Sequence, residues 1–239
     1  LSDAMGALSD EKRVGPAVWR LARRQHGVIT AGQLMELGFG KRAIIHRVQR
    51  GRLHRVHRGI YAVGSPDLSR HGIWMAAVLR CGPGAHLSHL SAAALWGIRD
   101  AHPSLPEVSV PARTRRRAPG IRIHQTKLLG PADLARRDRI PVTSPARTLI
   151  DLATRLEERS LERAVNEADK LGLIDSERLR EVVGERSGAR GVAPLRRLLD
   201  RRTFRLTDSE LEREFLRLVR RAGLPLPETR VPVNGFRVD

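Results

Sequence analysis

A run of basic side chains between residues 36 and 67 carries the clearest chemistry in this sequence. Seven cations and no carboxylate lie between Glu36 and Asp67. Arg and Lys neutralise phosphate oxygens, and Arg can also bond the edge of a guanine base. Such a basic stretch on a compact fold is typical of a protein that binds the phosphate backbone. The residues predicted to contact DNA are Lys41, Arg42, His46, Arg47, Arg50, Arg52, His54, Arg55 and Arg58.

The first elements that would position these residues are two short helices. Thr30 and Gln33 have the spacing of a capping box, so one helix should begin just after Thr30. A glycine-containing turn separates it from a second helix over residues 41–49. The periodicity of that helix predicts that Ile44 and Ile45 lie on one apolar face.

A basic hairpin is predicted directly after the second helix. Apolar residues alternate with basic ones over residues 53–63, and the turn is expected at residues 58–59. Helix, turn, helix and hairpin together predict a winged helix-turn-helix. In that fold the helix that begins at Lys41 enters the major groove, Arg47 meets a phosphate, and the hairpin forms the wing. Winged helices also dock proteins, so a protein-binding role stays open.

Composition limits the other classes of function. The formal net charge is +18, although a general excess of Arg could come from GC-rich coding. Aromatic residues make up 3% of the chain, which argues against modules that stack single-stranded bases. Cys81 is the one cysteine, so no disulfide and no cysteine-based zinc site can form within the chain. Neither a signal peptide nor a long apolar run is apparent, and we expect a cytoplasmic protein without membrane contact.

The chain is predicted to be an α+β protein with three parts. Residues 14–65 form the winged helix-turn-helix, and residues 69–205 form a mixed α+β middle domain of unknown role. Residues 206–239 form an incomplete α/β fragment with a final hairpin. Strand-like runs in the middle domain are expected over residues 107–110, 121–124 and 139–142.

Two further groups of polar residues could carry chemistry. His86 and His89 have the spacing of a ligand pair, but no Cys or carboxylate lies near them in sequence. Zinc sites usually have four ligands, so no metal site is predicted. Arg147 and Asp151 are four residues apart, and we expect them to form an ion pair on one helical face rather than a catalytic pair.

One string of the sequence resembles the N-terminal winged helix of the abortive-infection type IV antitoxin (AbiEi-like) family, and two later strings resemble motifs that recur after this domain in actinobacterial relatives. The first spans residues 28–64 and contains the pattern G-x-L-x-x-V-x-x-G-x-Y, and the others are HLSAAALW (89–96) and VTSPARTLIDLA (142–153). The resemblance implies a protein that binds its operator in double-stranded DNA and represses its own operon. It also implies a cognate nucleotidyltransferase toxin as a partner. A homodimer is left open.

The end of the chain suggests an alternative. The strings SELE (209–212), GLPLP (223–227) and VD (238–239) resemble the start of a very-short-patch-repair-like endonuclease of the PD-(D/E)xK superfamily. That resemblance implies that Glu212 and Asp239 help to bind Mg²⁺, the one cofactor considered. Mg²⁺ needs more ligands than two carboxylates, so we expect no cleavage by this chain as it stands. Either the sequence is truncated or the nuclease unit is degenerate, and an end at a motif residue favours truncation.

Overall fold

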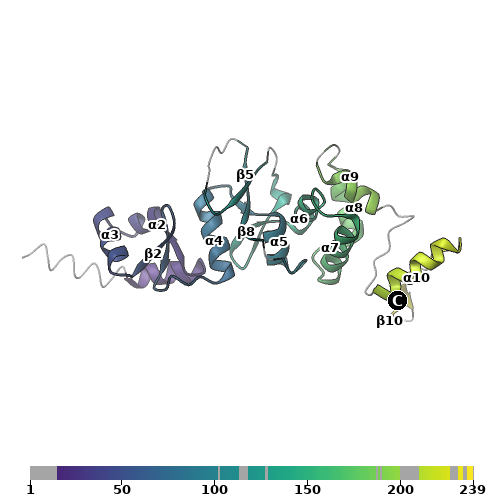
Figure 1. The fold of residues 1–239 in the computed structure, drawn as a ribbon, viewed down its shortest axis with the longest axis horizontal. Helices are drawn as coiled ribbons and strands as arrows, with labels where there is room; N and C mark the ends of the chain where they lie inside the picture. Colours follow the sequence, from purple (N-terminus) through teal and green to yellow (C-terminus); the bar gives the residue numbers. More distant parts are fainter. Residues whose placement is uncertain are drawn as a thin grey trace, which may run out of the picture. The chain divides into compact units, whose positions relative to one another are not determined.

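The structure is a computed structural model with a mixed α+β fold, as the sequence predicts (Figure 1). It describes residues 15–239 except 102, 113–117, 127–128, 187, 189, 200–209, 227–230, 234–235 and 239. The chain divides into two compact units, whose described residues lie within the ranges 15–95 and 101–144 for the first and 96–100 and 145–238 for the second. No helix among these described residues is long and apolar enough to cross a membrane.

The first unit begins with a winged helix, which confirms the predicted N-terminal fold. Its elements are a helix over residues 15–24, β1 (Val28–Thr30), α2 (Ala31–Glu36), α3 (Lys41–Gln49), β2 (Leu53–His57) and β3 (Ile60–Val63). The three strands form an antiparallel sheet in the order β1-β3-β2. The hairpin turns at residues 58–59, as expected from the sequence.

Helix α2 starts where the capping box predicts. The Thr30 Oγ1 atom accepts a hydrogen bond from the Gln33 backbone N–H at 3.0 Å, and the Gln33 side chain accepts from the Thr30 N–H at 3.0 Å. Strand β1, which ends on the same Thr30, was not predicted from the sequence. Its Val28 pairs with Ala62 in the sheet. Three residues are too few to show strand periodicity, so only the partner strand reveals them.

A single apolar core holds the winged helix together. Leu34 of α2 is fully buried. Ile29 of β1, Ile44 of α3 and Tyr61 of β3 belong to the same cluster, so both helices and these two strands share one core. The expectation for Ile45 was wrong, because 56% of this side chain is exposed. The core lies along one side of α3, and Ile45 is on the other side.

The rest of the first unit is built on a five-stranded sheet in the order β6-β5-β4-β8-β7. The strands are β4 (His86–Leu87), β5 (Glu107–Pro111), β6 (Arg122–Thr126), β7 (Leu134–Arg137) and β8 (Ile140–Thr143). Helix α4 (Arg70–Cys81) packs against β8 and β5, and α5 (His89–Trp96) follows β4. The three predicted strand-like runs correspond to β5, β6 and β8, whereas β4 and β7 were not predicted.

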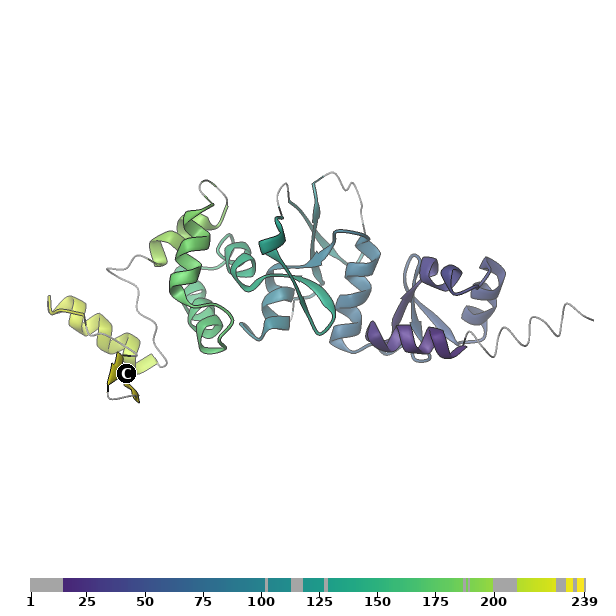
Figure 2. The same ribbon diagram turned by 180° about the vertical axis from the view of Figure 1, so that it is seen from behind.

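The second unit is mainly helical. It contains α6 (Pro145–Leu152), α7 (Glu158–Lys170), α8 (Ser176–Gly184), α9 (Val192–Leu198), α10 (Glu210–Arg221), β9 (Val231–Val233) and β10 (Phe236–Val238). Helix α6 contacts α7, and α9 contacts both α7 and α8 (Figure 2). Strands β9 and β10 pair as the predicted antiparallel hairpin, with Phe236 opposite Val233.

The winged-helix core gives a direct test of stability. Leu34→Ala should lower the free energy of unfolding by about 2–5 kcal/mol, because it leaves a cavity at a fully buried position. The neighbouring Met35 is 47% exposed, so Met35→Ala should stay within about 0.5 kcal/mol of the original. Urea unfolding followed by tryptophan fluorescence measures both. Equal losses in the two variants would contradict this description of the core.

Candidate nucleic-acid interface

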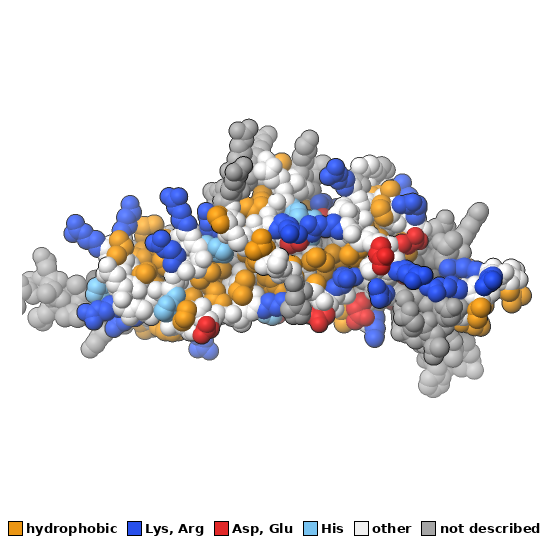
Figure 3. All heavy atoms as spheres, viewed as in Figure 1, with side chains coloured by type: hydrophobic (Ala, Val, Ile, Leu, Met, Phe, Trp, Pro, Cys, Tyr) orange, Lys and Arg blue, Asp and Glu red, His pale blue; other side chains and the backbone are white. Residues whose placement is uncertain are grey.

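One side of helix α3 presents its side chains to solvent. Arg42, Ile45, His46 and Gln49 are all exposed, and their spacing of three and four residues aligns them in one stripe. Ile44 is buried on the opposite side. This stripe and the exposed wing residues Arg55 and Arg58 are called the basic face below. Figure 3 shows Lys and Arg side chains standing out from this part of the molecule.

The first turn of α3 carries positive charges, which are unfavourable at the N-terminus of a helix. The N-cap is Gly40, no side chain caps the first turn, and no acidic residue lies in that turn. Lys41 and Arg42 instead add two cations beside the positive end of the helix dipole. Each such charge costs about 0.3–1 kcal/mol at a surface position. An anion at this end would satisfy free backbone N–H groups and both side chains.

The wing adds further cations to this surface. Strands β2 and β3 meet in a tight turn in which Gly59 has a φ of +78°, a conformation that suits glycine. Arg55 lies opposite the buried Tyr61 and is itself exposed, as is Arg58 at the turn. The register shifts between Arg55 and His57, so the strand bends at this point.

Arg47 is held by the protein itself. Its guanidinium carbon lies 4.2 Å from the centre of the Phe39 ring, and Nη1 donates to the Ala43 carbonyl at 3.4 Å. The contact with the ring is a cation–π interaction that fixes the end of the turn between α2 and α3. Arg47 therefore has a structural role beside any phosphate contact.

The structure brings all nine predicted DNA-contact residues into α3, the segment after it and the wing. Seven of them are exposed: Lys41, Arg42, His46, Arg50, Arg52, Arg55 and Arg58. Arg47 and His54 are partly buried, and His54 Nε2 lies 3.3 Å from the Gly64 carbonyl. Ile45 was not predicted as an exposed member of the basic face, because its apolar character matched the expected core pattern.

Two histidines of the first unit, His57 in β2 and His86 in β4, have lowered pKa values. Burial lowers the pKa of His57, and the nearby Arg80 lowers it further. Burial is also the largest cause of the lowered pKa of His86. A hydrogen bond to the Gly84 backbone raises this pKa, and the charge of Arg136 lowers it. An ordinary histidine has a pKa near 6.5, so a lowered pKa favours the neutral form of both rings at pH 7. His57 is thus less charged at pH 7 than an ordinary histidine.

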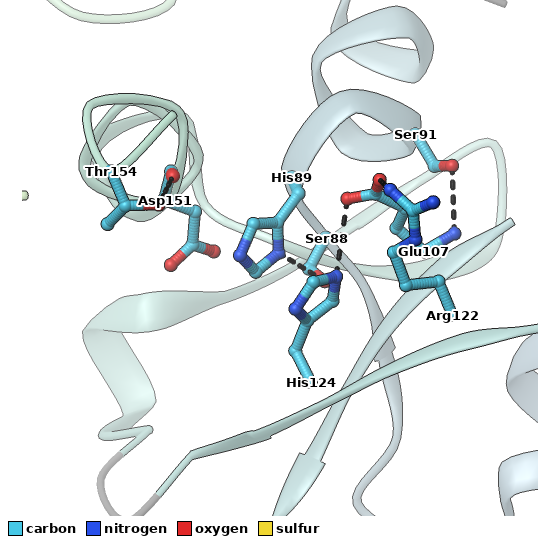
Figure 4. A network of polar contacts seen from close by, with 8 residues as sticks. All are labelled: Ser88, His89, Ser91, Glu107, Arg122, His124, Asp151 and Thr154. Carbon is cyan, nitrogen blue, oxygen red and sulfur yellow. Dashed lines mark hydrogen bonds and ion pairs between the residues drawn. The ribbon is translucent and has the colours of Figure 1, made fainter. Parts of the chain in front are cut away.

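Two further groups of polar residues interact with one another outside the basic face. The structure brings His89 together with Glu107 and His124 rather than with His86 (Figure 4). Sequence spacing could not reveal this cluster, although Glu107 and His124 both lie in strands that were predicted. Arg147 Nε donates to Asp151 Oδ1 at 2.9 Å, which confirms the predicted ion pair.

The side chains of the two predicted nuclease residues lie outside the part of the chain that the structure describes. Glu212 belongs to α10, but its side chain lies outside the described part of the chain, as does Asp239. The Mg²⁺-binding role of this pair stays a prediction.

A winged helix with a basic face is the architecture of many transcriptional regulators, and the comparisons identify the family. Residues 18–64 match the family model described as "Transcriptional regulator, AbiEi antitoxin", and residues 85–201 match "AbiEi antitoxin C-terminal domain". The chain belongs to the AbiEi antitoxin family. The predicted resemblance is thereby confirmed.

Proteins of Mycobacterium tuberculosis resemble this chain in sequence and in fold. The chain is 30% identical over 200 residues to the uncharacterized proteins Rv2248 and MT2308 from two strains of Mycobacterium tuberculosis, covering 81% of this chain and 71% of each relative. It also resembles the crystal structure of the RV2827C protein of Mycobacterium tuberculosis, with a TM-score of 0.51. That match covers 79% of this chain and 76% of the other at 20% identity, so it shows a shared fold.

The two histidine environments can be tested separately by NMR titration. Arg80→Gln should raise the pKa of His57, because it removes a repelling positive charge, and should leave His86 unchanged. Arg136→Gln should raise the pKa of His86 and leave His57 unchanged. Both values should stay below the ordinary one, since burial persists. A variant that shifts both histidines equally would refute these separate causes.

Proposed function

We propose that this protein is an antitoxin that binds an operator in double-stranded DNA through its winged helix and represses its own operon. The observation that carries the proposal is the basic face, which lies within a stretch that has no carboxylate between Glu36 and Asp67. The match of residues 18–64 to a transcriptional-regulator model supports it. Membership of the AbiEi family supports the antitoxin role.

In the proposed complex, α3 lies in the major groove with its N-terminus toward the DNA. Lys41 and Arg42 would reach base edges or the nearest phosphates, and the exposed Ile45 would contact a thymine methyl group. Arg55 and Arg58 on the wing would bind the flanking backbone. His46, Arg50, Arg52 and His54 complete the proposed contact set, with Arg47 contributing from its position on Phe39.

The family also suggests a toxin as a partner. We propose a cognate nucleotidyltransferase toxin, bound by the part of the chain that matches the AbiEi antitoxin C-terminal domain, residues 85–201. Its helices and five-stranded sheet lie outside the winged helix, so DNA and toxin would use different surfaces. A homodimer would let two winged helices bind the halves of a palindromic operator.

A charge-reversal experiment tests the DNA-binding proposal. The probe is a duplex that covers the region upstream of the protein's own reading frame, with a shuffled duplex of equal length for comparison. Arg42→Glu combined with Arg55→Glu should abolish the mobility shift at low salt, because each change replaces a contacting cation with a repelling anion. Each single Arg→Gln change that removes an interaction with a phosphate should reduce the slope of log K against log salt by about one.

The control reverses the same amount of charge elsewhere. Arg159 in α7 and Arg197 in α9 are exposed and lie outside the winged helix, so their double reversal to Glu should keep the upstream duplex bound. Circular dichroism checks that both double variants are folded. Binding that survives in the Arg42/Arg55 variant, or that is abolished equally in the control, would reject the basic face as the interface.

A further inference from the structure

A cleft lies in the first unit between the turn of the wing and the five-stranded sheet. Its volume is about 880 Å³, within the range of roughly 300–1,000 Å³ that is typical of small-molecule sites. Its walls come from the wing turn at Gly59, from the C-terminal end of α4 with the loop after it, and from the paired strands β7 and β8. This space is called the α4 cleft below.

Helix α4 fixes the two sides of the α4 cleft to one another. It contacts β1, β2 and β3 of the winged helix and also β4, β5 and β8 of the five-stranded sheet (Figure 1). His26 Nε2 lies 2.6 Å from the Asp138 carbonyl oxygen, and His71 Nε2 of α4 lies 3.4 Å from the Asp138 carboxylate. The α4 cleft is therefore part of one packed body and exists before any ligand binds.

Three arginines from the three walls surround the α4 cleft. Arg58 comes from the wing turn, Arg80 from the last turn of α4, and Arg136 from β7. No acidic residue is among the described residues that line the cleft. Within the described part of the chain, none of these three arginines takes part in an ion pair. The cleft therefore concentrates positive charge that its own lining does not compensate.

The histidines near the α4 cleft respond to this charge. Burial is the largest cause of the lowered pKa of His57, and the charge of Arg80 lowers that pKa further. Burial is also the largest cause for His86, which lines the cleft, and the charge of Arg136 again acts to lower the pKa. Positive charge thus reaches both rings, and an anion in the cleft would oppose it.

Apolar side chains also line the α4 cleft. Ile60 and Val78 are almost fully buried there, whereas Leu79 and Pro141 are partly exposed. A DNA backbone presents its phosphates along an extended strand, but a nucleotide presents phosphates beside the apolar face of a single base. A hollow with both cationic and apolar lining therefore suits a small organic anion better than it suits a DNA strand.

We propose that the α4 cleft binds a small organic molecule that carries phosphate groups, with nucleoside triphosphates as the reference ligands. Arg58, Arg80 and Arg136 bind the phosphates, since a guanidinium group can donate two parallel hydrogen bonds to phosphate oxygens. The apolar side chains contact the organic part of the ligand. Arg58 also belongs to the basic face, so DNA and this ligand would share one arginine. Ligand binding itself does not rest on the proposed DNA binding.

Calorimetry on the full chain without DNA tests this proposal. ATP, GTP, CTP and UTP are titrated separately, and at least one should bind saturably with one molecule per chain. Inorganic triphosphate should bind more weakly, because it lacks the part that contacts the apolar side chains. Arg80→Gln and Arg136→Gln should each weaken nucleotide binding by roughly tenfold or more, because each removes hydrogen bonds between charged groups.

Arg137→Gln is the matched control, because Arg137 follows Arg136 in the edge strand β7 but does not line the α4 cleft. It should keep the original affinity, and thermal melting without ligand checks that all three variants are folded. Three results would each overturn the proposal. They are no saturable nucleotide binding at millimolar concentration, equal losses in Arg136→Gln and Arg137→Gln, and inorganic triphosphate that binds as tightly as the nucleotides.

A mobility shift separates this site from a DNA contact. Arg80→Gln and Arg136→Gln should keep the original affinity for the upstream duplex, since neither arginine lies on the basic face. Weaker DNA binding with a smaller salt dependence in both variants, together with no nucleotide binding, would assign these arginines to the DNA backbone instead and reject the proposal. The variant with Arg42→Glu and Arg55→Glu should still bind nucleotide, so the two proposals can fail separately.

Discussion

The pairing of β1 with β3 is the constraint on which the basic face depends. Strand β1 leads directly into α2 through the capping box at Thr30, and β3 is the inner strand of the wing. Helix α3 is attached to the same body by Ile44, which joins the core around Leu34 and Tyr61. Helix α3 and the wing therefore have a fixed geometry before any ligand arrives.

This core supports an unusual surface. Cations at the start of α3 work against the helix dipole, and no neighbouring acid compensates them within the stretch between Glu36 and Asp67. A surface selected only for stability would contain more acidic residues here. Arg47 differs from its neighbours, because stacking on Phe39 gives its charge a structural use. Lys41, Arg42 and Arg55 are exposed instead, where an anionic ligand can reach them.

The sequence predicted those parts of the fold that have strong local signals. Helices such as α7 show clear amphipathic periodicity, the Thr30–Gln33 box marks a helix start, and the 53–63 hairpin alternates apolar with basic residues. Strands β1, β4 and β7 are only two to four residues long and are defined by partners elsewhere in the chain. Propensity carries almost no information at that length.

The candidate sites also differ in whether neighbouring or distant residues form them. The basic face comes from one stretch of the sequence, so composition located its basic residues but not Ile45 and Gln49, whose exposure depends on which side of α3 meets the core. The His89–Glu107–His124 cluster depends on the parallel register of β5 and β6, which places Glu107 beside Arg122 and Ser109 beside His124. Sequence spacing paired His89 with His86 because it could not anticipate this register.

The tight attachment of α3 to the wing also bears on how fast the protein can find a target. A surface that needs no rearrangement can engage DNA at first contact, so association would be limited by diffusion and by the long-range attraction of a chain with net charge +18. Such attraction extends over a Debye length of about 8 Å at physiological salt. In this view the net charge would raise the association rate with DNA, and the rigid geometry would favour the correct target. The pairing of β1 with β3 provides that rigidity.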